Sequence, residues 1–169
     1  AREDLDQFGL TYNRMREKNM IFVLIRIHLQ IKKPIHVSDN LEIYTYPRRI
    51  TGATFIRDFI ITDGKINYAE CVSAWVLIDF FSRKPLRPSA LWAEIPSCHE
   101  NELTLTMDKK LELNGTITEL GERKVFYSYL DENNHLNNTV YADIISDYMP
   151  EQLRAENKRI STLKINFLN

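Results

Sequence analysis

The chain has 169 residues, of which 44% are hydrophobic and 27% are charged, so it can bury a core and is not a disordered chain. Its formal net charge of -1 gives no reason to expect a nucleic acid as partner. Two cysteines provide neither a disulfide framework nor metal-ligand spacing, and no apolar run approaches the ~18 residues of a membrane span, so we expect a globular protein of a reducing, cytosol-like compartment.

The first 31 residues predict helix followed by strand. Residues 1–18 carry apolar side chains at three- to four-residue spacing and are interrupted by Gly9, which predicts the end of one helix and a short second helical turn. From Val23 to Ile31 every odd-numbered residue is apolar. This period of two predicts a strand and excludes a helix.

The next segments predict an antiparallel meander. Residues 41–46 form a strand-like run that ends at Pro47, and residues 53–62 and 65–81 are two β-rich runs. The dipeptide Asp63-Gly64 joins these two runs, and it readily adopts the positive φ angles of a tight hairpin turn. A helix followed by long antiparallel strands favours an α+β fold with the helix on the sheet.

Residues 82–96 contain three prolines and no period, which predicts a connection between two domains. With a boundary near residue 97, the sequence predicts domains at residues 1–96 and 97–169. In the second domain we expect strands at residues 111–119 and 124–130, a helix to about Tyr148, and a last strand at residues 163–167.

A polar turn lies between the expected strand at residue 130 and the helix. Asp131, Asn133 and His135 alternate in this turn, and Asn137 or Asn138 could cap the helix. The helix would bury an apolar face made of Val140, Tyr141, Ile144, Ile145 and Tyr148. The polar side chains would then converge beside the unpaired N–H groups of a helix N-terminus, where an oxyanion can be held.

The same turn carries a family resemblance. The run Asp131-Glu-Asn133-Asn-His135-Leu-Asn137-Asn138 resembles the Asp-x-Asn-x-His-x-Asn-Asn signature of the acyl-acyl carrier protein thioesterases of plants and bacteria. Residues 9–12, 21–31, 73–79 and 83–88 look like the N-terminal half of that family.

The resemblance implies a double hotdog fold, in which two tandem domains each wrap an antiparallel sheet round a long helix. Residues 1–96 would be the half with the acyl pocket, and residues 97–169 the catalytic half. Both domains are expected to be incomplete, because the opening strand of the first would precede Ala1 and a family glutamate would follow Asn169.

The resemblance also implies an activity, the hydrolysis of fatty acyl-acyl carrier protein to free fatty acid and carrier protein in fatty acid biosynthesis. No metal or organic cofactor is implied, and Asp131, Asn133 and His135 are the catalytic candidates. Phe55, Phe59 and Trp75 would line the acyl site, with an ordinary core role as the alternative, and Asn137 and Asn138 would contact substrate.

The chemistry of this turn suits a thioester. A thioester carbonyl attacked by water develops negative charge on its oxygen, which a helix N-terminus and an amide donor such as Asn133 can stabilise. An imidazole can accept a proton near neutral pH, so His135 could activate the water, while Asp131 orients the imidazole or the amide. Alternatively, the family glutamate is the base and His135 positions the water.

Basic residues suggest a surface for the acidic carrier protein. Arg83, Lys84 and Arg87 are the main candidates, and Arg48, Arg49 and Arg57 could extend the same surface. Cys71 lies in a strand-like run and is interpreted as a buried core residue, not as a nucleophile.

Other functions stay open at this level: a hotdog hydrolase of acyl-coenzyme A, and an acyl-binding module without catalysis. A hotdog dehydratase is a third alternative, which the Asn-rich pattern disfavours. The expected compartment is the cytoplasm of a bacterium, or the plastid if the source is a plant. A homodimer is one of the assemblies that the sequence allows.

Overall fold

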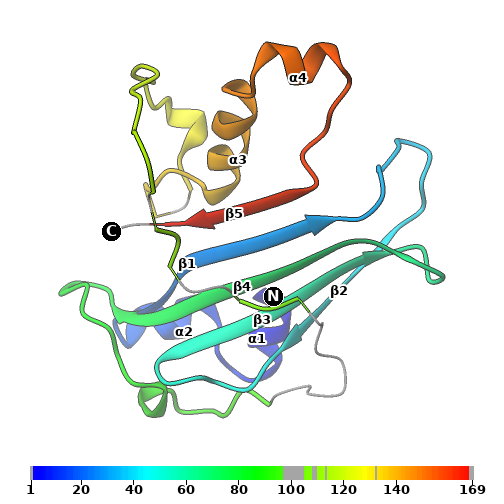
Figure 1. Ribbon diagram of the computed structural model, residues 1–169. Coiled ribbons are helices and arrows are strands. Elements are labelled where there is room, and N and C mark those ends of the chain that lie inside the picture. The colour runs from blue at the N-terminus through cyan, green and yellow to red at the C-terminus, as the bar shows by residue number, and fades with distance from the viewer. Residues whose placement is uncertain (1, 97–104, 108–109, 113, 132, 168–169) are drawn as a thin grey trace. The chain divides into compact units, whose positions relative to one another are not determined.

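The computed structural model describes residues 2–96, 105–107, 110–112, 114–131 and 133–167 (Figure 1). Two compact units can be distinguished: residues 1–111 with 161–169, and residues 112–160. The predicted boundary near residue 97 lies outside the described residues. The first unit contains, in chain order, α1 (Arg2–Gln7), α2 (Tyr12–Glu17), β1 (Met20–Ile31), β2 (Glu42–Pro47), β3 (Thr54–Thr62), β4 (Asn67–Asp79), the 3-10 turn η1 (Pro88–Ala90) and β5 (Thr162–Asn166).

The strands of the first unit form one sheet in the order β2-β3-β4-β1-β5, and every neighbouring pair is antiparallel. The predicted helices, the meander and the last strand are therefore confirmed. At the hairpin between β3 and β4, the Asp63 carboxylate accepts hydrogen bonds from the backbone N–H groups of Lys65 and Ile66, each at 2.9 Å. Gly64 has a φ of +83°, which a residue with a side chain rarely adopts.

The register of β4 sorts its side chains onto two faces of the sheet. Trp75 is paired with Leu24 of β1 and with Phe55 of β3, and Leu77 is paired with Phe22. Directly paired residues project from the same face, so these five side chains share one side of the sheet. The even-numbered residues of β4 project from the other side.

A β-bulge in β1 changes which face its residues use. The pairing shifts from Leu24 opposite Trp75 to Arg26 opposite Ala74, so Ile25 is an extra residue. Its backbone oxygen accepts a hydrogen bond from the N–H of Phe167 at 3.0 Å. The strand predicted from a period of two is confirmed, but its odd-numbered residues do not all share one face.

A small apolar core packs between the helical segment and the sheet face that carries Phe55 and Leu77 (Figure 1). Leu10 and Met15 are 1% and 5% exposed, and Phe55 and Leu77 are 8% and 0% exposed. The rings of Phe22 and Phe55 meet edge to face with centroids 4.9 Å apart. Burial of this apolar surface fastens α1 and α2 to the sheet.

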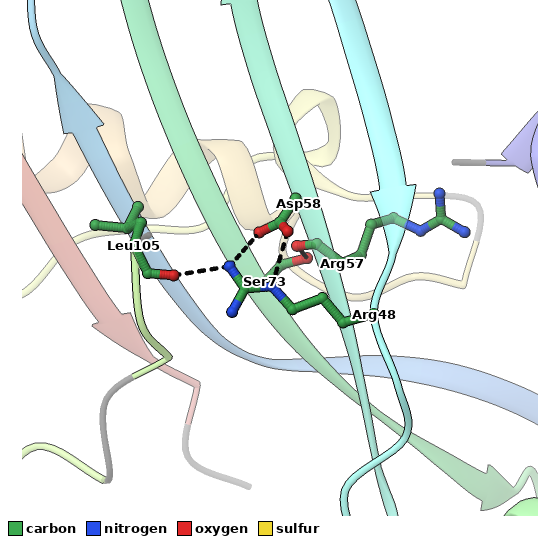
Figure 2. A network of polar contacts seen from close by, with 5 residues as sticks. All are labelled: Arg48, Arg57, Asp58, Ser73 and Leu105. Carbon is green, nitrogen blue, oxygen red and sulfur yellow. Dashed lines mark hydrogen bonds and ion pairs between the residues drawn. The ribbon is translucent and has the colours of Figure 1, made fainter. Parts of the chain in front are cut away.

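A buried ion pair belongs to the opposite face (Figure 2). The Asp58 carboxylate is fully buried, and the Arg48 guanidinium donates to both of its oxygens at 2.7 and 2.8 Å. The same guanidinium donates to the backbone carbonyl of Leu105 at 2.8 Å. Nδ1 of His28 lies 3.1 Å from the backbone carbonyl oxygen of Thr106. Two side chains therefore hold consecutive carbonyl groups of one segment against the sheet.

The second unit contains η3 (Tyr127–Tyr129), α3 (Asn138–Asp147) and α4 (Glu151–Ala155). The strands predicted at residues 111–119 and 124–130 are wrong, since the described residues of both ranges form no strand. In η3, backbone N–H groups instead bond the carbonyl three residues earlier, from Tyr129 to Phe126 at 3.0 Å and from Leu130 to Tyr127 at 3.1 Å.

The helix α3 follows the predicted polar turn, but the expectation of a buried helix is wrong for this unit. None of its residues is buried. Tyr141 is 37% exposed, and Ile145 and Tyr148 are each 41% exposed. The physical reason is that the described residues of this unit supply no strand to cover the apolar side of the helix.

The Arg48–Asp58 pair yields a prediction for stability. Asp58→Ala removes the partner of a largely buried guanidinium, so the free energy of unfolding should fall by about 3–5 kcal/mol in urea denaturation. Asp6→Ala removes an exposed carboxylate of α1 and serves as the control, with a change within about 0.5 kcal/mol. The double variant Arg48→Met with Asp58→Leu should recover much of the loss, since no charge is then left unpaired. Equal stability of Asp58→Ala and the control would contradict a structural role for the pair.

Candidate active site

The predicted catalytic residues lie in one tight turn that the Asp131 carboxylate closes. One carboxylate oxygen accepts the backbone N–H groups of Asn133 at 2.8 Å and of His135 at 3.0 Å. The backbone N–H of Asp131 also donates to the carbonyl of His135 at 2.8 Å. Asn134 sits at the tip with a φ of +58°, in the left-handed region that asparagine tolerates.

The carboxylate of Asp131 thus bonds to the backbone of its own turn. The sequence suggested that Asp131 orients the imidazole or an amide side chain, whereas the bonds that the structure gives it are to the N–H groups of Asn133 and His135. This arrangement is the one by which Asp and Asn mimic a backbone turn. Asp131 therefore fixes the backbone positions of Asn133 and His135, from which their side chains project.

The helix begins directly after the turn. Asn137 is its N-cap, and its side-chain oxygen accepts from the backbone N–H and the hydroxyl of Thr139, each at 3.0 Å. The backbone N–H of Asn137 donates to the carbonyl of Tyr129 at 2.8 Å, which ties the start of the helix to η3. Of the two predicted caps, Asn137 is confirmed, and Asn138 is the first helical residue.

The candidate groups differ in exposure. Asp131 and Asn133 are partly buried, and His135, Asn137 and Asn138 are exposed. The turn therefore presents an imidazole to solvent immediately before a helix of ten residues. The N-terminus of such a helix carries partial positive charge, which favours a nearby oxyanion.

The three aromatic residues predicted for the acyl site come together in the first unit. Phe55 and Trp75 are directly paired, and Phe59 is four residues along β3 on the same face. The indole N–H of Trp75 donates to the hydroxyl of Ser73 at 2.8 Å. Phe55 belongs to the core, while Phe59 and Trp75 are only partly buried, so the latter two are the better placed for an acyl chain.

The predicted basic surface is only partly correct. Arg83, Lys84 and Arg87 are exposed after β4, as expected. Arg48 and Arg57 are not part of an exposed surface, because Arg48 pairs with Asp58, and Arg57 pairs with Asp4 of α1. Sequence reasoning missed both ion pairs. For the Arg48 pair a signal was available in the sequence: Asp58 is a carboxylate within an otherwise largely apolar strand, and a buried carboxylate needs a cationic partner.

Three further observations concern the described residues. Burial and, to a smaller extent, the negative charge of Asp58 raise the pKa of Cys71 to about 11, so its thiol is a poor nucleophile, as predicted. No group of three or more His, Cys, Asp or Glu side chains that could hold a metal occurs in the described parts of the chain. Among the same residues, no helix has the length and apolar character to cross a bilayer.

Solved structures share this fold. An acyl-ACP thioesterase from Bacteroides thetaiotaomicron aligns with a TM-score of 0.78 and 18% identity over 97% of this chain and 66% of its own. The 12:0-ACP thioesterase from Umbellularia californica aligns with a TM-score of 0.73 and 20% identity over 98% of this chain and 66% of its own. The chain thus spans just under two thirds of each structure. These similarities confirm the predicted α+β architecture of tandem hotdog domains.

Family models agree with this result, although no curated protein sequence matches the chain significantly. The Acyl-ACP thioesterase N-terminal domain matches residues 1–95, and the Acyl-ACP thioesterase C-terminal domain matches residues 113–168. The first match alone covers more than half of the sequence, and the second includes the turn from Asp131 to His135. The chain belongs to the acyl-ACP thioesterase family.

Proposed function

We propose that this chain carries the acyl site and most of the active site of a thioesterase that hydrolyses fatty acyl-acyl carrier protein. The observation that carries the proposal is the turn that the Asp131 carboxylate closes, which puts Asn133 and His135 directly before the N-terminus of α3. The products would be a free fatty acid and the carrier protein thiol, and the reaction would belong to fatty acid biosynthesis in the cytoplasm of a bacterium or the plastid of a plant.

The reaction needs three groups from the protein: donors that stabilise an oxyanion, a base, and an acid that protonates the leaving thiolate. Water attacks the thioester carbon, and the carbonyl electrons move to oxygen and form an oxyanion. A base takes a proton from the water. When the oxyanion collapses, the carbon–sulfur bond breaks and the sulfur leaves with its electron pair, to be protonated as a thiol. The fatty acid is left as its carboxylate or acid.

The turn residues can be assigned to these steps. The amide of Asn133 and the N-terminus of α3 would stabilise the oxyanion, since both present N–H groups. His135 would be the base, or it would position the water for a glutamate base. A thioester borne on a carrier protein has to approach from solvent, and the exposure of His135 is consistent with this. Asp131 acts as a positioning residue through the backbone of the turn.

The other parts of the proposed substrate contact the first unit. The acyl chain would lie against Phe59 and Trp75, which are apolar and incompletely buried. The carrier protein would contact Arg83, Lys84 and Arg87. A homodimer remains a prediction, and sedimentation of the purified protein would measure it.

His135→Ala should lower kcat for acyl-carrier protein hydrolysis by about 10²–10⁴, because it removes either the base or the group that positions the water. Steady-state release of the carrier thiol measures this. His36→Ala removes another exposed histidine, from the loop before β2, and is the matched control with unchanged turnover. Unchanged turnover of His135→Ala would contradict the catalytic role of His135. Acyl binding without turnover in the unmodified chain would leave a binding module as the better description.

Asp131→Asn and Asp131→Ala should differ in the order of the turn. Asparagine keeps a side-chain oxygen that can accept the N–H groups of residues 133 and 135, whereas alanine leaves both N–H groups without this acceptor. Amide hydrogen exchange should therefore accelerate strongly at these two positions in Asp131→Ala and only slightly in Asp131→Asn. Equal exchange in the two variants would contradict the positioning role.

The acyl donor can be tested with one acyl group on two carriers. The proposed reaction requires a higher kcat/KM for the acyl-carrier protein than for the matched acyl-coenzyme A. Both rates are read from thiol release with the same chain length at the same ionic strength. A preference for coenzyme A would favour the rival hotdog hydrolase.

A further inference from the structure

Four cations from two segments lie over two aromatic rings in the first unit, and two more exposed cations follow β4. Arg14 and Lys18 lie over the ring of Trp92, with the guanidinium carbon and the ammonium nitrogen 5.2 and 5.3 Å from its centroid. Arg16 and Arg83 both lie over the ring of Phe80, at 3.3 and 5.0 Å. Lys84 and Arg87 complete the set, which we call the basic surface: Arg14, Arg16, Lys18, Arg83, Lys84 and Arg87.

Contacts between the segments make this a single surface. Arg16 of α2 contacts Phe80, and the backbone N–H of Phe80 donates to the carbonyl of Asn19, just after α2, at 2.7 Å. Figure 1 shows α2 beside the end of β4, from which this second segment leaves the sheet. The cations of α2 are therefore neighbours of those that follow β4.

The charges of the basic surface are not neutralised within the described part of the chain. The ion pairs among the described residues involve Lys32, Arg48, Arg57 and Arg123, and none of the six cations of the basic surface takes part in one. Nη1 of Arg16 is buried and lacks a hydrogen-bond acceptor. Cation–π contacts hold four of the cations in place without cancelling their charge. The acidic residues of α2 and of residues 79–94 are Glu17, Asp79 and Glu94.

The turn that carries Arg83 and Lys84 is held firmly. The Asp79 carboxylate accepts the backbone N–H and the hydroxyl of Ser82 at 2.7 and 2.8 Å, and these bonds lower the pKa of Asp79. The backbone N–H of Asp79 donates to the carbonyl of Lys84, and that of Arg83 donates to the carbonyl of Asp79, each at 2.9 Å. Because Asp79 is engaged in the turn, it does not pair with the cations.

An exposed aromatic residue projects from the same turn. Phe81 is 75% exposed, although a phenylalanine is usually buried. Its ring packs edge to face on Phe80, with centroids 5.4 Å apart. A large apolar side chain amid unpaired positive charge is the combination found at the anchor of a protein interface.

We infer that the basic surface and Phe81 form the docking site for an acidic protein, the acyl carrier protein of the proposed reaction. The inference rests on the proposed function and deepens it, because it adds α2 and an apolar anchor to Arg83, Lys84 and Arg87. Carboxylates of the partner pair with the fixed cations, and Phe81 enters an apolar depression between them. The fixed cations lose little conformational freedom when they pair.

Direct binding tests this site independently of catalysis. The affinity of the purified 169-residue chain for labelled holo-acyl carrier protein is measured by fluorescence anisotropy at low salt and at ~0.15 M salt. The double variant Arg14→Glu with Lys18→Glu should raise Kd about tenfold or more and flatten its salt dependence. The matched control, Lys65→Glu with Lys158→Glu, makes the same change in net charge at exposed positions elsewhere and should leave Kd nearly unchanged.

A second variant tests the anchor. Phe81→Ser should weaken binding about tenfold and keep the salt dependence, because it removes apolar contact and no charge. Circular dichroism melting of each variant verifies that it is folded. Equal Kd values for the surface and control variants would overturn the docking site, as would tighter binding of a short DNA duplex than of the carrier protein. A chain that binds the carrier protein but hydrolyses no acyl thioester would refute the proposed function and leave the docking site standing.

Discussion

The register of β4 between β1 and β3 is the constraint on which the rest of the first unit depends. Because side chains alternate along a strand, this register sends Trp75 and Leu77 to the helices and Ala74 and Val72 to the other side. A slip of one residue would turn Trp75 and Leu77 to the face that carries the buried carboxylate of Asp58. The core and the buried ion pair therefore require the same alignment.

The two faces of the sheet are stabilised by different interactions. On one face, Leu10, Met15 and their neighbours fasten two short helices by burial of apolar surface. On the other face, Arg48 and His28 hold the backbone carbonyl groups of Leu105 and Thr106, which lie 57 and 78 residues further along the chain, respectively. Hydrogen bonds to a charged donor are stronger than neutral ones, and their geometry is more specific. The apolar face allows some repacking, whereas the polar face selects one position.

Local patterns predicted most of the first unit. Alternation, the Asp63-Gly64 turn and the break at Gly9 each depend on a few adjacent residues, so the strands, the hairpin and the two helices could be read from the sequence. The ion pairs of Arg48 and Arg57 could not, since their partners are fixed by strand register and by helix placement. Both arginines were consequently mistaken for surface residues. The cations of α2 were missed for a related reason, as only the fold brings them to Phe80 and Trp92.

The sequence predicted which residues form the turn of the candidate site, but it predicted their arrangement only in part. The Asn-rich run correctly indicated a turn and a helix cap, because both are local. The strand expected before it was wrong, since apolar alternation over residues 125–130 does not form a strand without a neighbour to pair with. The role of Asp131 differs from the predicted orientation of a side chain. Its carboxylate bonds instead to the backbone N–H groups two and four residues later, because these lie close to it in the sequence.

The extra residue in β1 has a wider consequence. Before Ile25 the even-numbered residues Met20, Phe22 and Leu24 accompany the helices, and after it Arg26 and His28 turn to the opposite side. The even-numbered residues of β1 therefore face the helices in the first stretch, and the odd-numbered residues Ile27 and Leu29 take that side in the second. Exchange of one side chain here alters one contact, but loss of the inserted residue would rotate the whole second stretch by half a turn. Sequence length at this point is thus more tightly constrained than sequence identity.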